Sequence, residues 1–238
     1  MLRFFGAVYK YIENHFRTRI GTIRVLFTDV DGTLTRRRIG TYQYGLLVLW
    51  YRYDTWLQRF WWIGMVLPPY VFYLLGRLKA FPNETDLVYR GIHSYCFKGL
   101  HRTRCRTICE KHLCLDVREK AKEFIEKLGA DRVVCITASP QDVYDPVLSG
   151  SVGEVIGTKL AYDDDGYYTG EVWHLMNGPN KAIAKSEYLR SLEGTHETWG
   201  MGDTKHDIEL LESVDHAIVV DPDETLGKRA NRKHWAFL

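Results

Sequence analysis

The sequence predicts an α/β fold: a Rossmann-like parallel sheet core with a helical cap inserted after the first strand. Three short apolar runs that favour β structure, residues 23–28, 133–136 and 216–220, are expected to form buried strands. Residues 120–127 and 180–192 lie between these runs and have helical periodicity. Strands that alternate with helices are typical of a parallel sheet covered on both faces.

Composition excludes some classes of protein. With 238 residues, 45% of them hydrophobic, the chain is long enough to bury a full core and a sizeable insertion. A formal charge of +2 is too balanced for a general nucleic-acid binder, so we expect no nucleic-acid partner. The five cysteines are odd in number, and Met1 is not followed by a secretion signal pattern. We therefore expect a reduced, cytoplasmic location.

Residues 1–20 predict an N-terminal amphipathic helix, because apolar side chains recur near helical spacing with basic residues between them. The simpler interpretation is that this helix packs against the protein's own core. An alternative is peripheral contact with a membrane, since a basic helix with aromatic residues can lie on a lipid surface.

Residues 36–117 interrupt the alternation of strands and helices with an aromatic-rich stretch. Its most apolar part, residues 60–76, has no charged residue, but Pro68 and Pro69 lie in its middle. Because interior prolines are costly in a helix, we expect short helices of a cap and no membrane span. The predicted division is a helix at 1–20, a catalytic core at 21–35 and 118–238, and a helical cap at 36–117.

The first candidate motif directly follows the first predicted strand. Asp29 and Asp31 lie one residue apart, and Gly32 allows the chain to turn away sharply. A carboxylate at the carboxyl end of a parallel strand points into the crevice where such sheets bind ligands. One carboxylate can attack while the other delivers a proton. A calcium loop is the alternative, but no acidic residues follow at its spacing.

The second predicted strand ends in Thr137, Ala138, Ser139 and Pro140. A hydroxyl at this place can donate a hydrogen bond to a phosphoryl oxygen, which makes Thr137 a candidate phosphate contact. Pro140 is suited to the opening of the next helix. The alternative role of Ser139 is to cap that helix, which is compatible with a phosphate contact by Thr137.

Two further motifs supply a lysine and two carboxylates. Lys181 comes at the start of a predicted helix, where it can neutralise a phosphoryl group. Asp203 and Asp207 follow a glycine-rich approach on a loop that enters a helix, so both can face one point. Oxygen ligands of this kind hold hard cations, and magnesium is the natural candidate. Helix capping by Asp203 is the structural alternative.

Taken together, these four motifs in this order resemble the haloacid dehalogenase superfamily over residues 23–238. Shorter matches at residues 157–160, 168–170 and 220–223 look like the subfamily that contains phosphoserine-phosphatase-like hydrolases. The resemblance implies a phosphatase with an inserted helical cap, an aspartyl-phosphate intermediate and Mg²⁺ as cofactor.

The resemblance also implies a role for each candidate residue. Asp29 would attack phosphorus, and Asp31 would protonate the leaving alcohol and then activate water. The phosphoryl oxygens would be held by Gly32, Thr137, Ala138 and Lys181. Magnesium would be bound by the carboxylates of Asp29 and Asp203 and the backbone carbonyl of Val30, with Asp207 supporting the site.

Two other functions stay open at this point. The same residues could transfer the phosphoryl group to a second alcohol, and the fold could serve as a membrane-associated, non-catalytic binding protein. For a phosphatase we expect a small-molecule or lipid phosphate ester with an apolar or uncharged organic part. Residues 36–38 are three arginines and the first acidic residue after Asp31 is Asp54, so an ammonium group would be repelled there.

Overall fold

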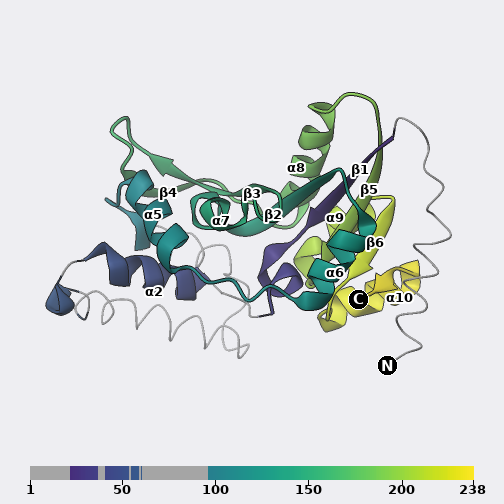
Figure 1. Ribbon diagram of the computed structural model, residues 1–238, viewed down its shortest axis with the longest axis horizontal. Helices are drawn as coiled ribbons and strands as arrows, with labels where there is room; N and C mark the ends of the chain where they lie inside the picture. The colour runs from purple at the N-terminus through teal and green to yellow at the C-terminus, as the bar shows by residue number, and fades with distance from the viewer. Residues whose placement is uncertain (1–21, 37–40, 54, 59, 61–95) are drawn as a thin grey trace.

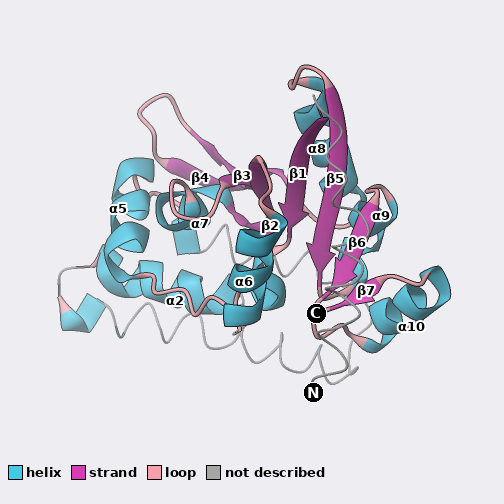
Figure 2. Cartoon of the chain, turned by 45° about the vertical axis from the view of Figure 1, so that its right-hand side comes forward, coloured by secondary structure: helices cyan, strands magenta, loops and turns pink. Residues whose placement is uncertain are grey.

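The computed structural model describes residues 22–36, 41–53, 55–58, 60 and 96–238. Its centre is a seven-stranded sheet in the order β4-β3-β2-β1-β5-β6-β7, in which only the β3–β4 pair is antiparallel (Figures 1 and 2). The strands are β1 (Thr22–Thr28), β2 (Arg132–Pro140), β3 (Glu154–Tyr162), β4 (Tyr168–His174), β5 (Thr195–Gly202), β6 (His216–Val219) and β7 (Ala236–Phe237). The α/β fold class is therefore confirmed.

The strands are connected mainly by helices, as a parallel sheet requires. The helices are α2 (Thr41–Arg52), α5 (Arg102–His112), α6 (Glu119–Leu128), α7 (Gln141–Leu148), α8 (Pro179–Arg190), α9 (Ile208–Glu212) and α10 (Glu224–Lys233). A wide helical turn, η1 (Val30–Leu34), follows β1, and a short turn, η2 (Lys205–Asp207), follows β5.

Strand β1 shows why the sheet is buried on both faces. Leu26 joins a core cluster with Phe124 of α6 and Tyr144 of α7, whereas its neighbour Phe27 joins a second cluster with Ala184 of α8. Because successive side chains of a strand point to opposite faces, a strand covered on both sides is a continuous apolar run. The predicted strands at 23–28, 133–136 and 216–220 and the helices at 120–127 and 180–192 are confirmed on this basis.

The segment 36–117 leaves and re-enters the core at adjacent points. Thr35 forms a bridge with Val117, and the amide of Arg36 donates to the carbonyl of Asp116 at 2.8 Å. Helices α2 and α5 lie inside this segment, and Tyr44, Val48 and Cys105 join the same core cluster as Leu26. The paired ends are what an insertion needs, but the division into core and cap stays a prediction.

Two predictions fall on residues outside the described ranges: the helix at 1–20 and nearly all of the apolar segment 60–76. Where the chain is described, none of its helices has the length and apolarity to cross a bilayer.

Candidate active site

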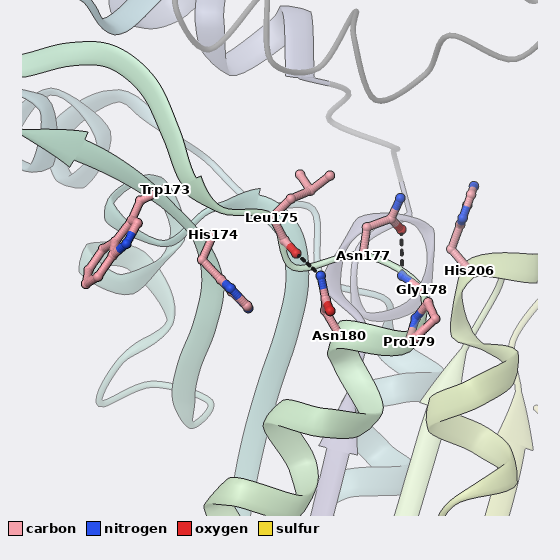
Figure 3. Close-up of a pocket in the computed structure, with 8 residues that line it drawn as sticks. All are labelled: Trp173, His174, Leu175, Asn177, Gly178, Pro179, Asn180 and His206. Carbon is pink, nitrogen blue, oxygen red and sulfur yellow. Dashed lines mark hydrogen bonds between the residues drawn. The ribbon is translucent and has the colours of Figure 1, made fainter.

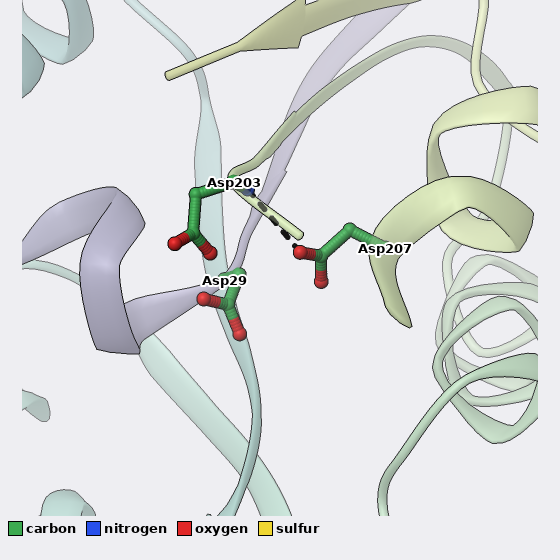
Figure 4. A group of neighbouring side chains, drawn as sticks. All are labelled: Asp29, Asp203 and Asp207. Carbon is green, nitrogen blue, oxygen red and sulfur yellow. Dashed lines mark hydrogen bonds between the residues drawn. The ribbon is translucent and has the colours of Figure 1, made fainter. Parts of the chain in front are cut away.

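Three buried carboxylates gather at the carboxyl end of the central strands (Figure 4). Asp29 directly follows β1, and its amide donates to the carbonyl of Met201 in β5 at 2.9 Å. Asp203 directly follows β5, and Asp207 ends the turn η2. One oxygen from each of these carboxylates lies within 4.8 Å of the others, so the structure brings the first and last motifs together.

Asp207 organises the loop that carries Asp203. Its Oδ2 atom accepts hydrogen bonds from the amides of Asp203 and Thr204, at 3.2 and 3.0 Å, and from Oγ1 of Thr204 at 3.1 Å. Thr204, not Asp203, therefore forms the cap of the turn together with Asp207. A Cβ atom on Gly202 would lie 2.5 Å from Cβ of Asp207, so the close approach of the loop requires glycine there.

Lys181 reaches into this group from the first turn of α8. Its Nζ atom lies 2.6 Å from Oδ1 of Asp29 and 2.6 Å from Oδ1 of Asp207. Burial opposes the charged form of Lys181, but the carboxylates of Asp207 and Asp29 outweigh it and raise the pKa of the lysine. Burial also raises the pKa of Asp29, with Lys181 acting against it and the neighbouring carboxylates adding to it. The ammonium group is thus fixed beside the candidate nucleophile.

Asp31 is hydrogen-bonded to the carboxyl end of β2 and to α7. Its Oδ2 atom accepts from Oγ of Ser139 at 2.8 Å and from Oγ1 of Thr137 at 3.4 Å, and its Oδ1 atom accepts from the hydroxyl of Tyr144. Burial raises the pKa of Asp31, while the hydrogen bonds from Tyr144 and Ser139 lower it. The protonated form of Asp31 is thereby made more accessible, as a proton donor needs.

The carboxyl end of β2 is held by its neighbours. Oγ1 of Thr137 accepts from the amide of Ser139 at 3.1 Å, and the carbonyl of Ala138 accepts from Oγ1 of Thr158 at 2.5 Å. A Cβ atom on Gly157 would lie 2.8 Å from the carbonyl oxygen of Ser139, so β3 can approach the end of β2 only with glycine there. Gly32 adopts a positive φ of 93°, which lets η1 turn over the same end of the sheet.

The Val30 carbonyl accepts from the amide of Thr35 at 3.0 Å and from its Oγ1 at 3.1 Å. Its role as a magnesium ligand stays a prediction. One expectation from sequence is corrected here. Ser139 does not cap α7: the cap position is Pro140, which precedes the helix rather than opening it, and the Ser139 hydroxyl binds Asp31.

Sequence reasoning missed Tyr144 and the bond between Ser139 and Asp31. Tyr144 lies four residues beyond Pro140 in a helix of ordinary amphipathic pattern, where a tyrosine is expected to be core. Its hydroxyl meets a residue 113 positions earlier in the chain. No local pattern signals such a contact.

The carboxylates fit a divalent cation. Asp29, Asp31, Asp203 and Asp207 meet at this edge of the sheet, and in the described part of the chain Lys181 is the lysine that ion-pairs with them. Buried negative charge in excess of positive charge is costly unless a cation balances it. Because all the side-chain donors are oxygens, the set suits a hard ion such as Mg²⁺.

Comparison with known proteins adds a family and relatives. The family model of haloacid dehalogenase-like hydrolases matches residues 26–212. An inhibition of morphological differentiation protein of Streptomyces azureus is 33% identical over 129 residues, which are 51% of this chain and 46% of that protein. A probable phosphatase of Mycobacterium tuberculosis is 34% identical over 115 residues, 47% of this chain and 39% of that protein. Each match spans less than half the length of the relative.

Solved structures share the fold. A protein of unknown function from Bordetella pertussis Tohama I has a TM-score of 0.71 and 17% identity, covering 91% of this chain and 98% of that chain. A phosphoserine phosphatase in apo form has a TM-score of 0.56 and 16% identity, and the match covers 87% of this chain and 91% of that chain. At these identities the likeness shows the fold alone.

Proposed function

The chain belongs to the haloacid dehalogenase-like hydrolase family, and from that premise we propose that it is a magnesium-dependent phosphomonoester hydrolase. The observation that carries the proposal is the contact between Lys181 and Asp29 at the end of β1, beside a second, hydroxyl-bound carboxylate, Asp31. A nucleophile, an acid/base partner and a fixed cation are the groups that phosphoryl transfer to a carboxylate needs.

In the proposed reaction, an Asp29 oxygen forms a bond to phosphorus while the bond between phosphorus and the ester oxygen breaks. The proton on Asp31 passes to that leaving oxygen, which departs as an alcohol. Asp31 then takes a proton from water, whose oxygen attacks phosphorus and releases inorganic phosphate and the Asp29 carboxylate. Thr137, Lys181 and the backbone at Gly32 and Ala138 hold the phosphoryl oxygens throughout.

The carboxylates of Asp29 and Asp203 and the backbone carbonyl of Val30 would hold the magnesium ion, with Asp207 keeping the loop and Lys181 in place. When bound, the ion offsets the charge repulsion between the carboxylate and the phosphate ester. Support comes from the oxygen-only donor set and its excess of negative charge.

The proposal is tested by turnover of phosphate esters with and without magnesium, together with acid quenching to trap phosphate on the protein. Asp29→Asn should lose both turnover and trapped phosphate, while Asp164→Asn, an exposed control in the β3–β4 hairpin, should keep both. Activity in Asp29→Asn equal to that of the wild type would overturn the assignment. Competing alcohols in the same assay distinguish hydrolysis from transfer, because transfer yields a new phosphate ester.

We further propose a substrate whose organic part is apolar or uncharged, including a lipid-like one. Arg36, an exposed cation, immediately follows the first motif and disfavours an ammonium group. The side chains of Trp56, Leu57 and Phe60 in the segment 36–117 are 68%, 65% and 60% exposed, which suits contact with an apolar substrate or a membrane surface. Specificity constants for phosphoserine and a short-chain lysophosphatidate decide this, and a preference for phosphoserine would refute it.

A further inference from the structure

Tyr144 is fully buried in α7 and belongs to none of the four motifs. Its hydroxyl donates to Oδ1 of Asp31. Burial and the Asp31 carboxylate raise the pKa of the Tyr144 phenol, so the hydroxyl stays protonated and acts as a donor to this carboxyl group. A buried phenol on the proposed proton donor is more than core packing requires.

The two oxygens of Asp31 have different surroundings. Oδ2 lies 3.4 Å from Oγ1 of Thr137, the proposed phosphate contact, and 2.8 Å from Oγ of Ser139. Oδ1 faces Tyr144 instead. Oδ2 is therefore the oxygen on the side of the phosphoryl group.

We propose that Tyr144 is a positioning residue, which holds Oδ1 of Asp31 so that Oδ2 faces the leaving oxygen of the substrate. This inference rests on the proposed phosphatase function and deepens it. The proton on Oδ2 passes to the leaving oxygen as its bond to phosphorus breaks, and Oδ2 later takes a proton from the attacking water. Tyr144 gives up no proton in either step.

Tyr144 is itself held by the segment 36–117. Its ring packs edge-on against that of Tyr44 in α2, with centroids 6.4 Å apart. The first turn of α7 carries Asp142, whose carboxylate accepts from Nε of Arg102 at 2.9 and 3.0 Å and from Nη1 of Arg106 at 3.2 Å, both in α5. Two helices of the inserted segment thus support the helix that positions Asp31.

The test replaces Tyr144 by Phe, which removes one oxygen and keeps the ring. With ethyl phosphate, whose leaving group needs a proton, we expect kcat to fall about tenfold to a hundredfold, as for loss of a hydrogen bond to a charged reacting group. KM should change less than about twofold, because the substrate keeps its own contacts. The first burst of p-nitrophenolate from p-nitrophenyl phosphate should keep its amplitude and its rate constant, because this leaving group needs no proton.

The comparison is made within one preparation, so that any unfolded fraction lowers the burst amplitude and the turnover of ethyl phosphate equally. Tyr188→Phe is the matched control: its hydroxyl donates to the Glu154 carboxylate at 2.6 Å, away from Asp31, and should change neither reading. In an Asp31→Asn background, Tyr144→Phe should have little further effect, because both changes act on one step.

An unchanged kcat for ethyl phosphate in Tyr144→Phe would overturn the inference. It would leave the proposed function intact if the Asp31→Asn variant has lost turnover of the same substrate. Equal losses in the burst and in ethyl phosphate turnover would show a structural role only and would also overturn it. No hydrolysis by the wild-type protein would refute the proposed function, and this inference with it.

Discussion

The Nζ atom of Lys181 lies 2.6 Å from Oδ1 of Asp29, the residue that directly follows the first strand. The same ammonium group lies 2.6 Å from Oδ1 of Asp207, so one lysine links the first and last motifs of the site. Both contacts are buried, where an unpaired charge is strongly destabilising. Lys181 therefore contributes to stability as well as to the proposed chemistry, and this makes it testable without a substrate.

Lys181→Met should abolish turnover and lower the free energy of unfolding by about 3–5 kcal/mol, because it leaves buried carboxylates without their partner. Urea unfolding without magnesium measures the loss, and added magnesium should restore part of it. Lys185→Met, one turn along α8, is the control. Burial lowers the pKa of Lys185, so its replacement should cost far less and should not respond to magnesium. An equal loss in both variants would contradict the proposed role of Lys181.

Asp29→Asn should abolish turnover and yet raise the free energy of unfolding of the metal-free protein by roughly 1 kcal/mol. The reason is that burial and the neighbouring carboxylates raise the pKa of Asp29, which means that the folded protein disfavours the charged carboxylate. The neutral amide of asparagine avoids this destabilisation. Urea unfolding beside the Asp164→Asn control checks this. A clear loss of stability in Asp29→Asn would show that the pair with Lys181 outweighs the burial cost.

Magnesium should stabilise the wild-type protein against heat, by ~2.7 kcal/mol at a hundred times its dissociation constant, because it binds the folded state. Asp203→Asn should remove most of this stabilisation. Glu209→Gln and Glu212→Gln should keep it, because both glutamates are exposed on α9. Thermal unfolding over a magnesium titration measures the effect. Equal magnesium responses of Asp203→Asn and wild type would contradict the metal assignment.

Gly202→Ala should destabilise the loop after β5 and lower magnesium affinity, since the added Cβ would lie 2.5 Å from Cβ of Asp207. We expect a cost of about 1–3 kcal/mol. Gly227→Ala is the opposite case, because its nearest neighbour, Cγ of Pro222, is 3.7 Å away and the residue lies in α10. It should stabilise the protein by about 0.5–1 kcal/mol. The two midpoints of thermal unfolding should therefore move in opposite directions.

Asp145 should contribute stability that depends on pH. Burial alone would raise the pKa of Asp145, but the hydroxyl of Ser149 and the Arg106 guanidinium, 2.7 Å away, lower it. A carboxyl group whose pKa is lowered by folding stabilises the protein at pH values above its pKa in the unfolded state. This contribution is lost as the pH falls through its pKa in the folded state. Asp145→Asn should thus have a lower free energy of unfolding than the wild type near neutral pH, and this difference should shrink in acid. Urea unfolding at several pH values measures it. A difference that stays constant down to pH ~2 would refute the proposed pH dependence.

The sequence by itself determined three of the strands, β1, β2 and β6, two of the helices and the chemical groups of the site. Strands buried on both faces are continuous apolar runs, and Asp29 and Thr137 stand at the carboxyl ends of two such runs. Because parallel strands end at the same edge of a sheet, these two side chains could be expected to meet there, whereas Lys181 and Asp203 are assigned to the site by the order of the motifs alone.

Only the tertiary structure decided which atoms of these groups are engaged with one another. The Val30 carbonyl accepts a hydrogen bond from the Thr35 hydroxyl, the Asp207 carboxylate binds Lys181, and the Tyr144 hydroxyl binds Asp31, 113 residues earlier in the chain. These contacts depend on hydrogen bonds between elements that packing brings together, and a hydrogen bond depends on distances of tenths of an ångström that no residue pattern encodes. Strands β3, β4, β5 and β7 are not predicted from the sequence. For β3 and β4 the reason is that a partly exposed hairpin has no continuous apolar run to reveal it.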